Sequence, residues 1–332
     1  MFEVDANLWL QQFQAPWFVF LMNLMSELGR SWIFTPVLVL LAFGVRLRPA
    51  LGVMLALVLV GAATDSIKMG MALPRPSEID ARVLEKGRTG EHVVADGAAR
   101  TFWGLPDDQA IAAVRATGRH DYGFISGHVS TAAALAISLA LVFGARKRRW
   151  WLLALAWPVL MAGSRMHLGR HFLGDVLGGF IAGLAAAGMA WALLRWVDPA
   201  RRPDARRWII PAVAVLGVAL LSLAWPVLNI YHAGSLGGLL LCLAWVDARA
   251  VPDAARGPWR RIGSAACALA FVLAAGAGLE ALYAAGGWPE GHAMSGLFAL
   301  VGYPLSLLGA LWLVRAVRLF PARREPGMGE VS

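Results

Sequence analysis

Residues 50–72 read ALGVMLALVLVGAATDSIKMGMA, and residues 50–63 of this stretch carry no polar side chain. A helix of roughly 20 predominantly apolar residues is long enough to cross the hydrocarbon core of a bilayer. Long apolar runs recur at 131–144 and 208–229. Of the 332 residues, 58% are hydrophobic, and the mean hydropathy is +0.61. Soluble domains are typically about half apolar, so we expect an integral membrane protein.

The apolar segments indicate about nine membrane spans, and the fold class expected is an all-α polytopic bundle. The expected spans are 31–45, 50–72, 126–144, 150–164, 172–194, 208–228, 234–248, 262–284 and 294–316. Residues 8–28 mix aromatic positions with Gln11, Gln12 and Glu27, and are too polar to span. This N-terminal segment is therefore expected to be an amphipathic helix lying at the membrane interface.

The positive charge of the chain indicates how it is oriented. Formal net charge is +9, and with nine spans the short Arg-rich loops all fall on one face. These loops are 46–49, 145–149, 195–207, 249–261 and 317–324. Such loops stay in the cytoplasm, so the chain is expected in a bacterial-type cytoplasmic (inner) membrane with its N-terminus outside. A membrane explains the charge, and no nucleic-acid partner is expected.

The unusual polar positions divide the chain into two expected domains. All of them lie within residues 1–200, which we interpret as a catalytic core of about five spans. Residues 201–332 form a membrane module of about four spans, whose role the sequence does not indicate. Cys242 and Cys267 each lie in an apolar segment, as small buried residues do, so neither a disulfide nor a metal cluster is expected.

Three short segments place costly polar residues on the same expected face. Lys68 lies near the outer end of its apolar helix, where a lysine is a functional candidate by default. Arg75 follows between two prolines, which end the helix and fix an extended turn. Ser126-Gly127-His128 opens another apolar helix. A helix N-terminus offers free backbone N–H groups to an anion, although Ser126 also fits a simple N-cap.

The third segment contains Arg165, His171 and Asp175. His171 and Asp175 are four residues apart at the head of a helix, so they share one face. A carboxylate bonded to one imidazole nitrogen fixes the tautomer and leaves the other nitrogen free to attack.

The combined inventory favours phosphoryl transfer without a metal. Its cations suit the oxygens of a phosphate, and two histidines suit a nucleophile and a general acid. Acidic residues are scattered rather than clustered as Mg²⁺ requires, so no cofactor is expected. Attack requires a neutral His171 and a protonated His128, which predicts a bell-shaped pH profile.

These segments resemble the three signature motifs of the type 2 phosphatidic acid phosphatase family, which is related to the vanadium haloperoxidases. The matching patterns are Lys68-x6-Arg75-Pro76, Ser126-Gly127-His128 and Ser164-Arg165-x5-His171-x3-Asp175. The resemblance covers about residues 8–195. One departure is Ile125, which stands where the family usually has proline and which bears on fine geometry rather than on chemistry.

The resemblance implies a role for each matching position. His171 would attack phosphorus to form a phosphohistidine, Asp175 would orient it, and His128 would protonate the leaving oxygen. The phosphoryl oxygens would be held by Lys68, Arg75, Ser126, Gly127 and Arg165.

The expected function is metal-independent hydrolysis of a phosphomonoester or pyrophosphate lipid in the membrane. Phosphatidic acid, phosphatidylglycerol phosphate, a polyprenyl pyrophosphate and a glycolipid phosphate all remain open as substrates. A phosphotransferase that passes the phosphoryl group to an acceptor lipid needs the same residues, and a non-enzymatic transporter or scaffold is a third alternative. Oligomeric state cannot be read from the sequence. The long connection 77–123 is expected to act as a lid or binding element, with Phe102 and Trp103 dipping into the membrane surface.

Overall fold

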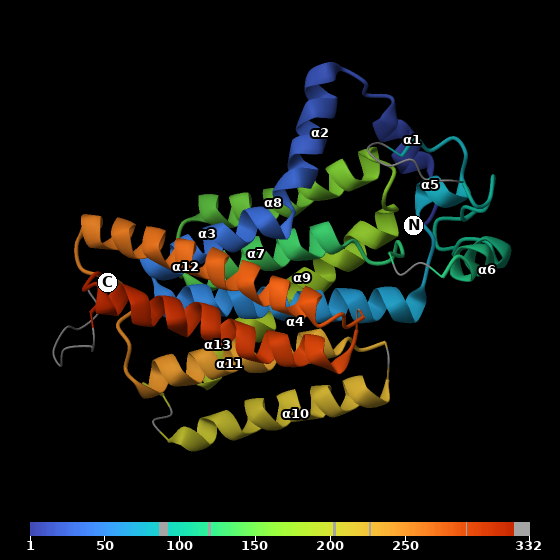
Figure 1. Cartoon of the computed structure of the whole chain (residues 1–332). Coiled ribbons are helices and arrows are strands. Elements are labelled where there is room, and N and C mark those ends of the chain that lie inside the picture. The colour runs from blue at the N-terminus through green and yellow to red at the C-terminus, as the bar shows by residue number, and fades with distance from the viewer. Residues whose placement is uncertain (86–91, 119–120, 202–203, 226, 290, 322–332) are drawn as a thin grey trace. The chain divides into compact units, whose positions relative to one another are not determined.

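The computed structural model is helical (Figure 1). The structure describes residues 1–85, 92–118, 121–201, 204–225, 227–289 and 291–321. Within these ranges the β pairing is limited to one isolated bridge, between Asp80 and Asp96. The expectation of an all-α chain is confirmed for the described part.

The helices follow the apolar segments of the sequence. In the first half they are α1 (Asp5–Gln11), α2 (Pro16–Leu28), α3 (Ser31–Gly44), α4 (Leu47–Met71), α5 (Pro76–Ile79), α6 (Asp108–Ala116), α7 (Gly127–Val142), α8 (Arg148–His167) and α9 (Leu173–Trp196). In the second half they are the 3-10 helix η1 (Ala205–Trp208), α10 (Ile209–Ala224), α11 (Ile230–Ala248), α12 (Pro258–Ala285) and α13 (Ala293–Ala316). Each of the nine expected spans therefore falls in a helix of its own.

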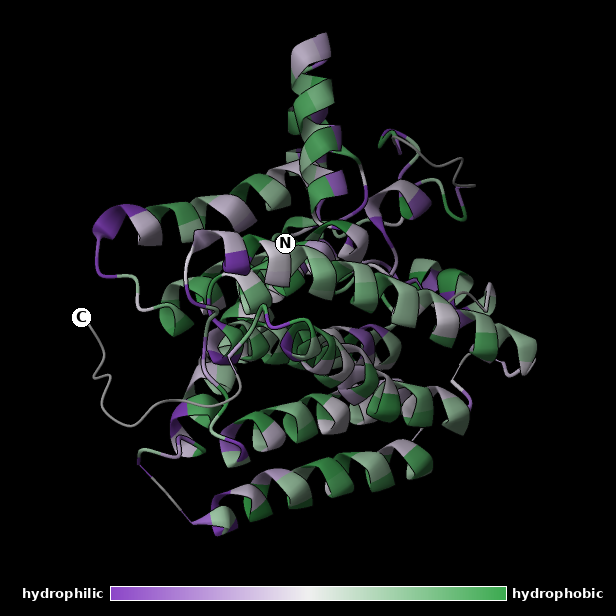
Figure 2. Ribbon diagram, turned by 60° about the vertical axis from the view of Figure 1, so that its left-hand side comes forward, coloured by the Kyte–Doolittle hydropathy of each residue, from purple (hydrophilic) through white to green (hydrophobic). Residues whose placement is uncertain are grey.

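Fewer helices than nine are shown to be long and apolar enough to cross a membrane. Within the described residues six meet that test, namely α4 with α5, η1 with α10, and α9, α11, α12 and α13. The pair α2 and α3, bent by 59°, meets it only together, and α7 is shorter. Green apolar residues run along most helices, and purple hydrophilic residues gather at helix ends and loops (Figure 2). By this measure the described residues contain six or seven candidate spans, which fits a multi-pass membrane protein. The count of nine spans stays a prediction.

The N-terminal segment differs from the single helix expected at 8–28. It forms two helices, because Pro16 occupies the first turn of α2 and the residue before it, Ala15, is held out of the helical conformation. The polar face of α1 is not turned to solvent, since Asn7 and Gln11 are buried. Whether this segment lies at a membrane interface stays a prediction.

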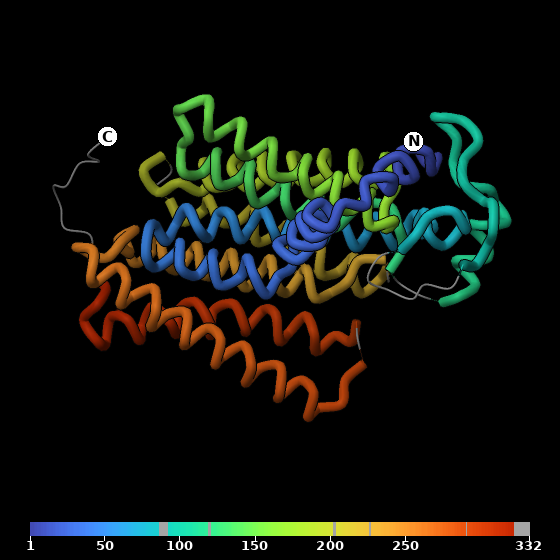
Figure 3. The backbone as a smooth tube through the Cα atoms, turned by 90° about the horizontal axis from the view of Figure 1, so that it is seen from above, coloured from blue at the N-terminus to red at the C-terminus, as the bar shows by residue number. Residues whose placement is uncertain are grey.

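The chain divides into two compact units whose boundaries lie inside α3, α4 and α9. Unit 1 consists of Met1–Phe34 and Leu59–Met189, and unit 2 of Thr35–Val58 and Ala190–Ser332. All the predicted site residues belong to unit 1. Near the N-terminus, unit 1 also contains α5, α6 and their connections (Figures 1 and 3).

Glycines let two site-bearing helices of unit 1 approach closely. A Cβ added to Gly179 of α9 would lie 2.6 Å from the carbonyl oxygen of Ser126, and one added to Gly183 would lie 2.5 Å from that of Ser130. Real Cβ atoms do not approach an oxygen so closely, so only glycine permits this contact. Small residues are the usual means by which membrane helices bring their backbones together. The start of α7 is thereby seated directly on α9.

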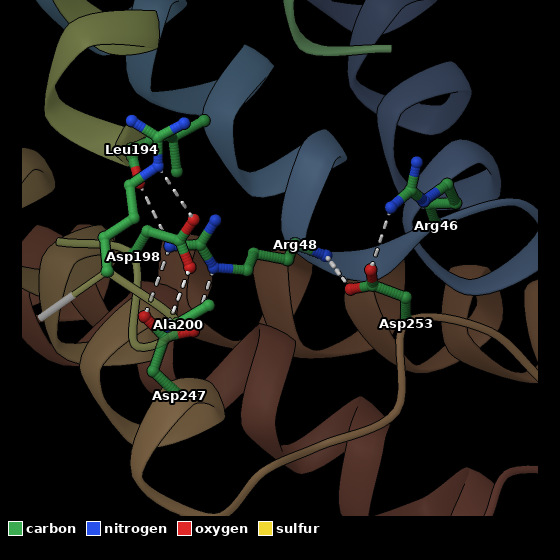
Figure 4. A network of polar contacts seen from close by, with 8 residues as sticks. Arg46, Arg48, Leu194, Asp198, Ala200, Asp247 and Asp253 are labelled. Atoms are coloured by element: carbon green, nitrogen blue, oxygen red, sulfur yellow. Dashed lines mark hydrogen bonds and ion pairs between the residues drawn. The ribbon is translucent and has the colours of Figure 1, made fainter. Parts of the chain in front are cut away.

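Unit 2 has its own tight helix contact and its own charged network. Helices α12 and α13 run side by side (Figures 1 and 3), and α13 also packs on α11. Figure 4 shows Arg48 between two carboxylates, with its Nε 2.9 Å from Asp247 Oδ1 and its backbone N–H 3.3 Å from Asp253 Oδ1. Arg48 Nη2 donates to the carbonyl of Leu194 at 3.2 Å, and Arg46 Nη2 lies 3.2 Å from Asp253 Oδ2. These bonds tie the start of α4 to the ends of α9 and α11.

Candidate active site

The first motif is fixed against the chain that leads into the second. Helix α4 ends at Met71, and Arg75 is extended at the start of α5 as the flanking prolines predict. Lys68 Nζ donates to the carbonyl of Tyr122 at 2.9 Å, and Arg75 Nη2 lies 3.2 Å from Asp121 Oδ2. Gly123 N–H donates to the carbonyl of Leu73 at 2.8 Å. The two cations of the first motif therefore lie beside the entry to the second.

The second motif opens α7 with its hydroxyl unused. Ser126 takes the N-cap position in an extended conformation, but its side chain makes no capping hydrogen bond. Its Oγ is buried and has no hydrogen-bond partner among the described residues. The simple capping interpretation of Ser126 is therefore not what the structure contains. A buried hydroxyl at a helix N-terminus is a group that can donate to an anion.

The second and third motifs are joined through the backbone. Ser126 N–H donates to the carbonyl of Asp175 at 2.9 Å, which the close approach of Gly179 makes possible. The helices that carry the first and second motifs are linked through side chains, since Thr64 of α4 and Ser130 of α7 bring their hydroxyl oxygens to 2.9 Å. The three sequence motifs thus converge within unit 1.

His171 and Asp175 form the pair that their spacing predicts. His171 Nδ1 lies 3.3 Å from Asp175 Oδ2, and the side chains are 3% and 0% exposed. The same carboxylate oxygen accepts the N–H of Phe172 at 2.9 Å, which fixes the carboxylate at the first turn of α9. With Nδ1 bonded to a carboxylate, Nε2 is the nitrogen left to act as a nucleophile or base.

Positive charge surrounds His171. Burial is the main cause that lowers the pKa of the His171 imidazole well below its ordinary value. Neighbouring charges lower this pKa further, and in order of effect these are Arg165, Lys68, Arg75 and His128. These four predicted residues from all three motifs therefore act electrostatically on the imidazole. The low pKa keeps the imidazole neutral, as a nucleophile must be.

Arg165 lies in the last turn of α8 and is 5% exposed. Its Nη1 donates to Ser26 Oγ of α2 at 2.7 Å, and the neighbouring Ser164 Oγ donates to the carbonyl of Met22 at 2.6 Å. Arg165 Nε is buried with no hydrogen-bond partner among the described residues, and the same holds for Arg75 Nε. Buried donors without a partner are costly, so both guanidinium groups are suited to a ligand that accepts hydrogen bonds.

His128 lies in the first turn of α7 and is partly exposed. Gly29, just after α2, approaches its ring so closely that an added Cβ would lie 2.8 Å from His128 Cδ2. The end of α2 therefore covers one side of this histidine. Among the residues that the structure describes, no group of three or more His, Cys, Asp or Glu side chains is placed to hold a metal ion.

Part of the connection 77–123 is bonded to the loop that carries the third motif. Ser77 Oγ donates to Glu85 Oε2 at 3.1 Å, and Arg170 Nη2 lies 3.7 Å from Glu85 Oε1. Phe102 and Trp103 are 46% and 79% exposed, which fits the membrane-dipping hypothesis without testing it. Residues 86–91 and 119–120 of the connection lie outside the described residues.

Sequence reasoning missed the residues of α1 that contact the third motif. Asn7 Nδ2 donates to the carbonyls of Met166 and His171, both at 2.9 Å, and Gln11 Nε2 donates to that of His167 at 3.0 Å. Their only signal was polar residues four apart within a short aromatic helix. The amphipathic segment expected from the sequence, 8–28, includes Gln11 but begins after Asn7.

The fold and the site together define a helical membrane protein with a carboxylate-bound histidine among cations suited to a phosphoryl group. Comparison with known families gives the same class. Residues 49–202 match the model of the PAP2 superfamily. At the level of the family, this match supports a phosphatase, which is a phosphoric ester hydrolase. The match begins at 49 rather than near 8, so α1, α2 and α3 lie outside it.

Two further comparisons concern curated proteins and solved structures. No curated protein matches the chain. The crystal structure of LpxE from Aquifex aeolicus is similar at 17% identity and a TM-score of 0.42, over 58% of this chain and 96% of that one.

Proposed function

We propose that this chain is a metal-independent lipid phosphatase of a bacterial-type cytoplasmic membrane, with its site open to the periplasmic or extracellular side. The observation that carries the proposal is the buried pair of His171 and Asp175, joined at 3.3 Å and surrounded by cations from all three motifs. The membrane helices make a phosphorylated lipid the natural substrate. Residues 1–200 would form the catalytic core, and residues 201–332 an additional membrane module.

In the proposed reaction, Nε2 of neutral His171 attacks phosphorus as the bond to the leaving oxygen breaks. The product is a phosphohistidine, and a protonated His128 supplies the proton that the leaving alkoxide needs. Water then attacks the phosphohistidine and releases inorganic phosphate. Asp175 holds Nδ1–H and stabilises the positive charge that develops on the imidazole, as the carboxylate of a catalytic triad does.

Charge on the phosphoryl oxygens grows toward the transition state, and fixed donors stabilise it most when they need not reorganise. The proposed donors are Lys68, Arg75, Arg165, the Ser126 hydroxyl and the Gly127 amide. Three of these groups carry buried donor atoms that find no partner in the part of the chain the structure describes, namely Arg75 Nε, Arg165 Nε and Ser126 Oγ. A phosphate would satisfy such atoms at once, which an apolar ligand would not.

The proposal is tested by phosphate release from a panel of lipid phosphates by the purified full-length protein in detergent with excess EDTA. We expect release to persist with the chelator and to vanish in His171→Ala. The matched control is His232→Ala, which removes a histidine from α11 in unit 2 and should leave release unchanged. Chelator-sensitive release, or release that survives in His171→Ala, would refute the mechanism. Transfer of phosphate to an acceptor lipid instead of water would identify a phosphotransferase.

A further inference from the structure

The backbone that carries His171 is held by a buried side-chain amide near the N-terminus, that of Asn7. Asn7 is 0% exposed, and its Nδ2 donates to the carbonyls of Met166 and His171, both at 2.9 Å. Carbonyl oxygens only accept hydrogen bonds, so the amino group of Asn7 has to face them. Both hydrogens of this amino group are therefore used on the segment that ends at the proposed nucleophile.

Gln11 repeats this arrangement one turn later. Residues four apart lie on one face of a helix, and Gln11 Nε2 donates to the carbonyls of His167 at 3.0 Å and of Leu84 at 2.7 Å. Its Oε1 accepts the N–H of Leu84 at 3.0 Å. Asn7 and Gln11 together, here named the amide clamp, thus contact three carbonyls within residues 166–171.

This segment needs external support because it lies between two helices. Helix α8 ends at His167 and α9 begins at Leu173, so the nucleophile lies on a short connection whose backbone groups are not all satisfied by a helix. Gly169 in this connection adopts φ +72, a left-handed conformation that glycine adopts readily. Contacts from elsewhere must therefore set the position of His171, and the amide clamp supplies them from α1.

We propose that Asn7 is a positioning residue for catalysis, which holds His171 at the distance and angle that attack on phosphorus requires, with Gln11 supporting the same loop. This proposal rests on the proposed function for its consequence on rate. Asn7 lies outside the region matched by the PAP2 model, which begins at residue 49. Its effect acts through His171 and not through contact with the substrate.

The test compares Asn7→Leu with Asn23→Leu in the full-length protein, using dioctanoyl phosphatidic acid in detergent micelles. Leucine has a similar size but no donor. Asn23 is a matched control because its Nδ2 donates at 2.9 Å to Val19 within its own helix, at an exposed position. We expect Asn7→Leu to lower kcat by about 10–100-fold with KM changed by less than about threefold, as loss of a supporting contact or a misplacement near 1 Å does.

A second variant guards against misfolding. Asn7→Ser keeps one short donor and should give a kcat between those of the wild type and Asn7→Leu. In both variants water should reach His171 more easily, so the acid limb of the kcat/KM profile should move to higher pH. An unchanged kcat in a folded Asn7 variant would overturn the proposal. So would a rise in KM alone, because that result would place Asn7 in substrate binding.

A measurement that needs no turnover distinguishes failure of the Asn7 proposal from failure of the proposed function. Diethyl pyrocarbonate modifies accessible imidazoles, and mass spectrometry reports the rate at His171 specifically. Faster modification in Asn7→Leu than in the wild type and Asn23→Leu would support the positional contact even if no lipid were hydrolysed. Equal rates in all three proteins would overturn the contact, whatever the activity.

Discussion

Two arginines, Arg48 in unit 2 and Arg165 in unit 1, have opposite surroundings. In unit 2, Arg48 is enclosed by Asp247, Asp253 and a carbonyl (Figure 4), and the side chains of the Arg48–Asp247 pair are 17% and 2% exposed. In unit 1, Arg165 contacts the neutral hydroxyl of Ser26, and its buried Nε has no hydrogen-bond partner among the described residues.

This difference distinguishes a structural ion pair from a cation that is available to bind an anionic ligand. The guanidinium of Arg48 is already neutralised by Asp247, and removing it leaves a buried carboxylate without its partner, which is costly. A buried arginine among other cations is repelled by them until an anion arrives. The same residue type is therefore expected to matter for stability in unit 2 and for chemistry in unit 1.

The largest effect is expected at Asp175. Asp175→Asn keeps the shape and an oxygen for the Phe172 amide, but it removes the charge that stabilises the imidazolium and disturbs the tautomer. We expect kcat to fall on the order of 10⁴-fold, the loss seen when the carboxylate of a catalytic triad becomes an amide. Phosphate release under saturating substrate measures it, beside Asp204→Asn, an exposed cap of η1. A loss below about tenfold would remove Asp175 from the mechanism.

The next comparison exchanges arginine for methionine in each unit. Arg48→Met leaves Asp247 buried without its partner, and should lower the free energy of unfolding by about 3–5 kcal/mol while the folded protein stays active. Arg165→Met should lower kcat/KM by about 10²–10³-fold, the cost of losing one preorganised transition-state donor, with little change in stability. Thermal unfolding and phosphate release of both variants give the answer. The reverse pattern would show that the comparison between the units is wrong.

The smallest effect is a displacement of the pH profile. The pKa of His171 is lowered by burial and then by the charge of Arg165, so the neutral nucleophile persists as the pH falls below about 6.5, the ordinary value for histidine. The acid limb of kcat/KM should therefore lie below that pH, within a bell-shaped profile. In Arg165→Met one of the lowering charges is gone, so the acid limb should move toward higher pH. An acid limb at or above the ordinary value in the wild type would contradict the assignment of His171.

Much of this architecture could be predicted, because the length and apolar composition of a segment indicate a membrane helix. The expected ranges 50–72 and 172–194 lie close to α4 and α9, and Pro74 and Pro76 fixed the extended turn at Arg75. The number of spans could not be settled in this way. Helix α7 is short, and α8 carries charged residues at both ends, so neither segment is decided by hydropathy alone.

The site was predictable where two residues are close in sequence, as His171 and Asp175 are, although His171 itself precedes the start of α9 at Leu173. It was not predictable where a side chain meets a distant carbonyl. Asn7 in a short helix looks the same whether it faces water or the backbone of residues 166–171. The hydrogen bond from Lys68 to Tyr122 was unpredictable for the same reason, since its acceptor is a backbone carbonyl that any residue would provide.

The close approach of Gly179 and Gly183 to α7 also limits which positions of α9 can be substituted. Exposed side chains of α9, such as Ile181 and Met189, can be changed in size without affecting this contact. At these two positions even one methyl group would meet a backbone oxygen of α7 and push apart the segments that carry Ser126 and Asp175. A change of size on α9 is therefore expected to be tolerated at its exposed positions and excluded at Gly179 and Gly183.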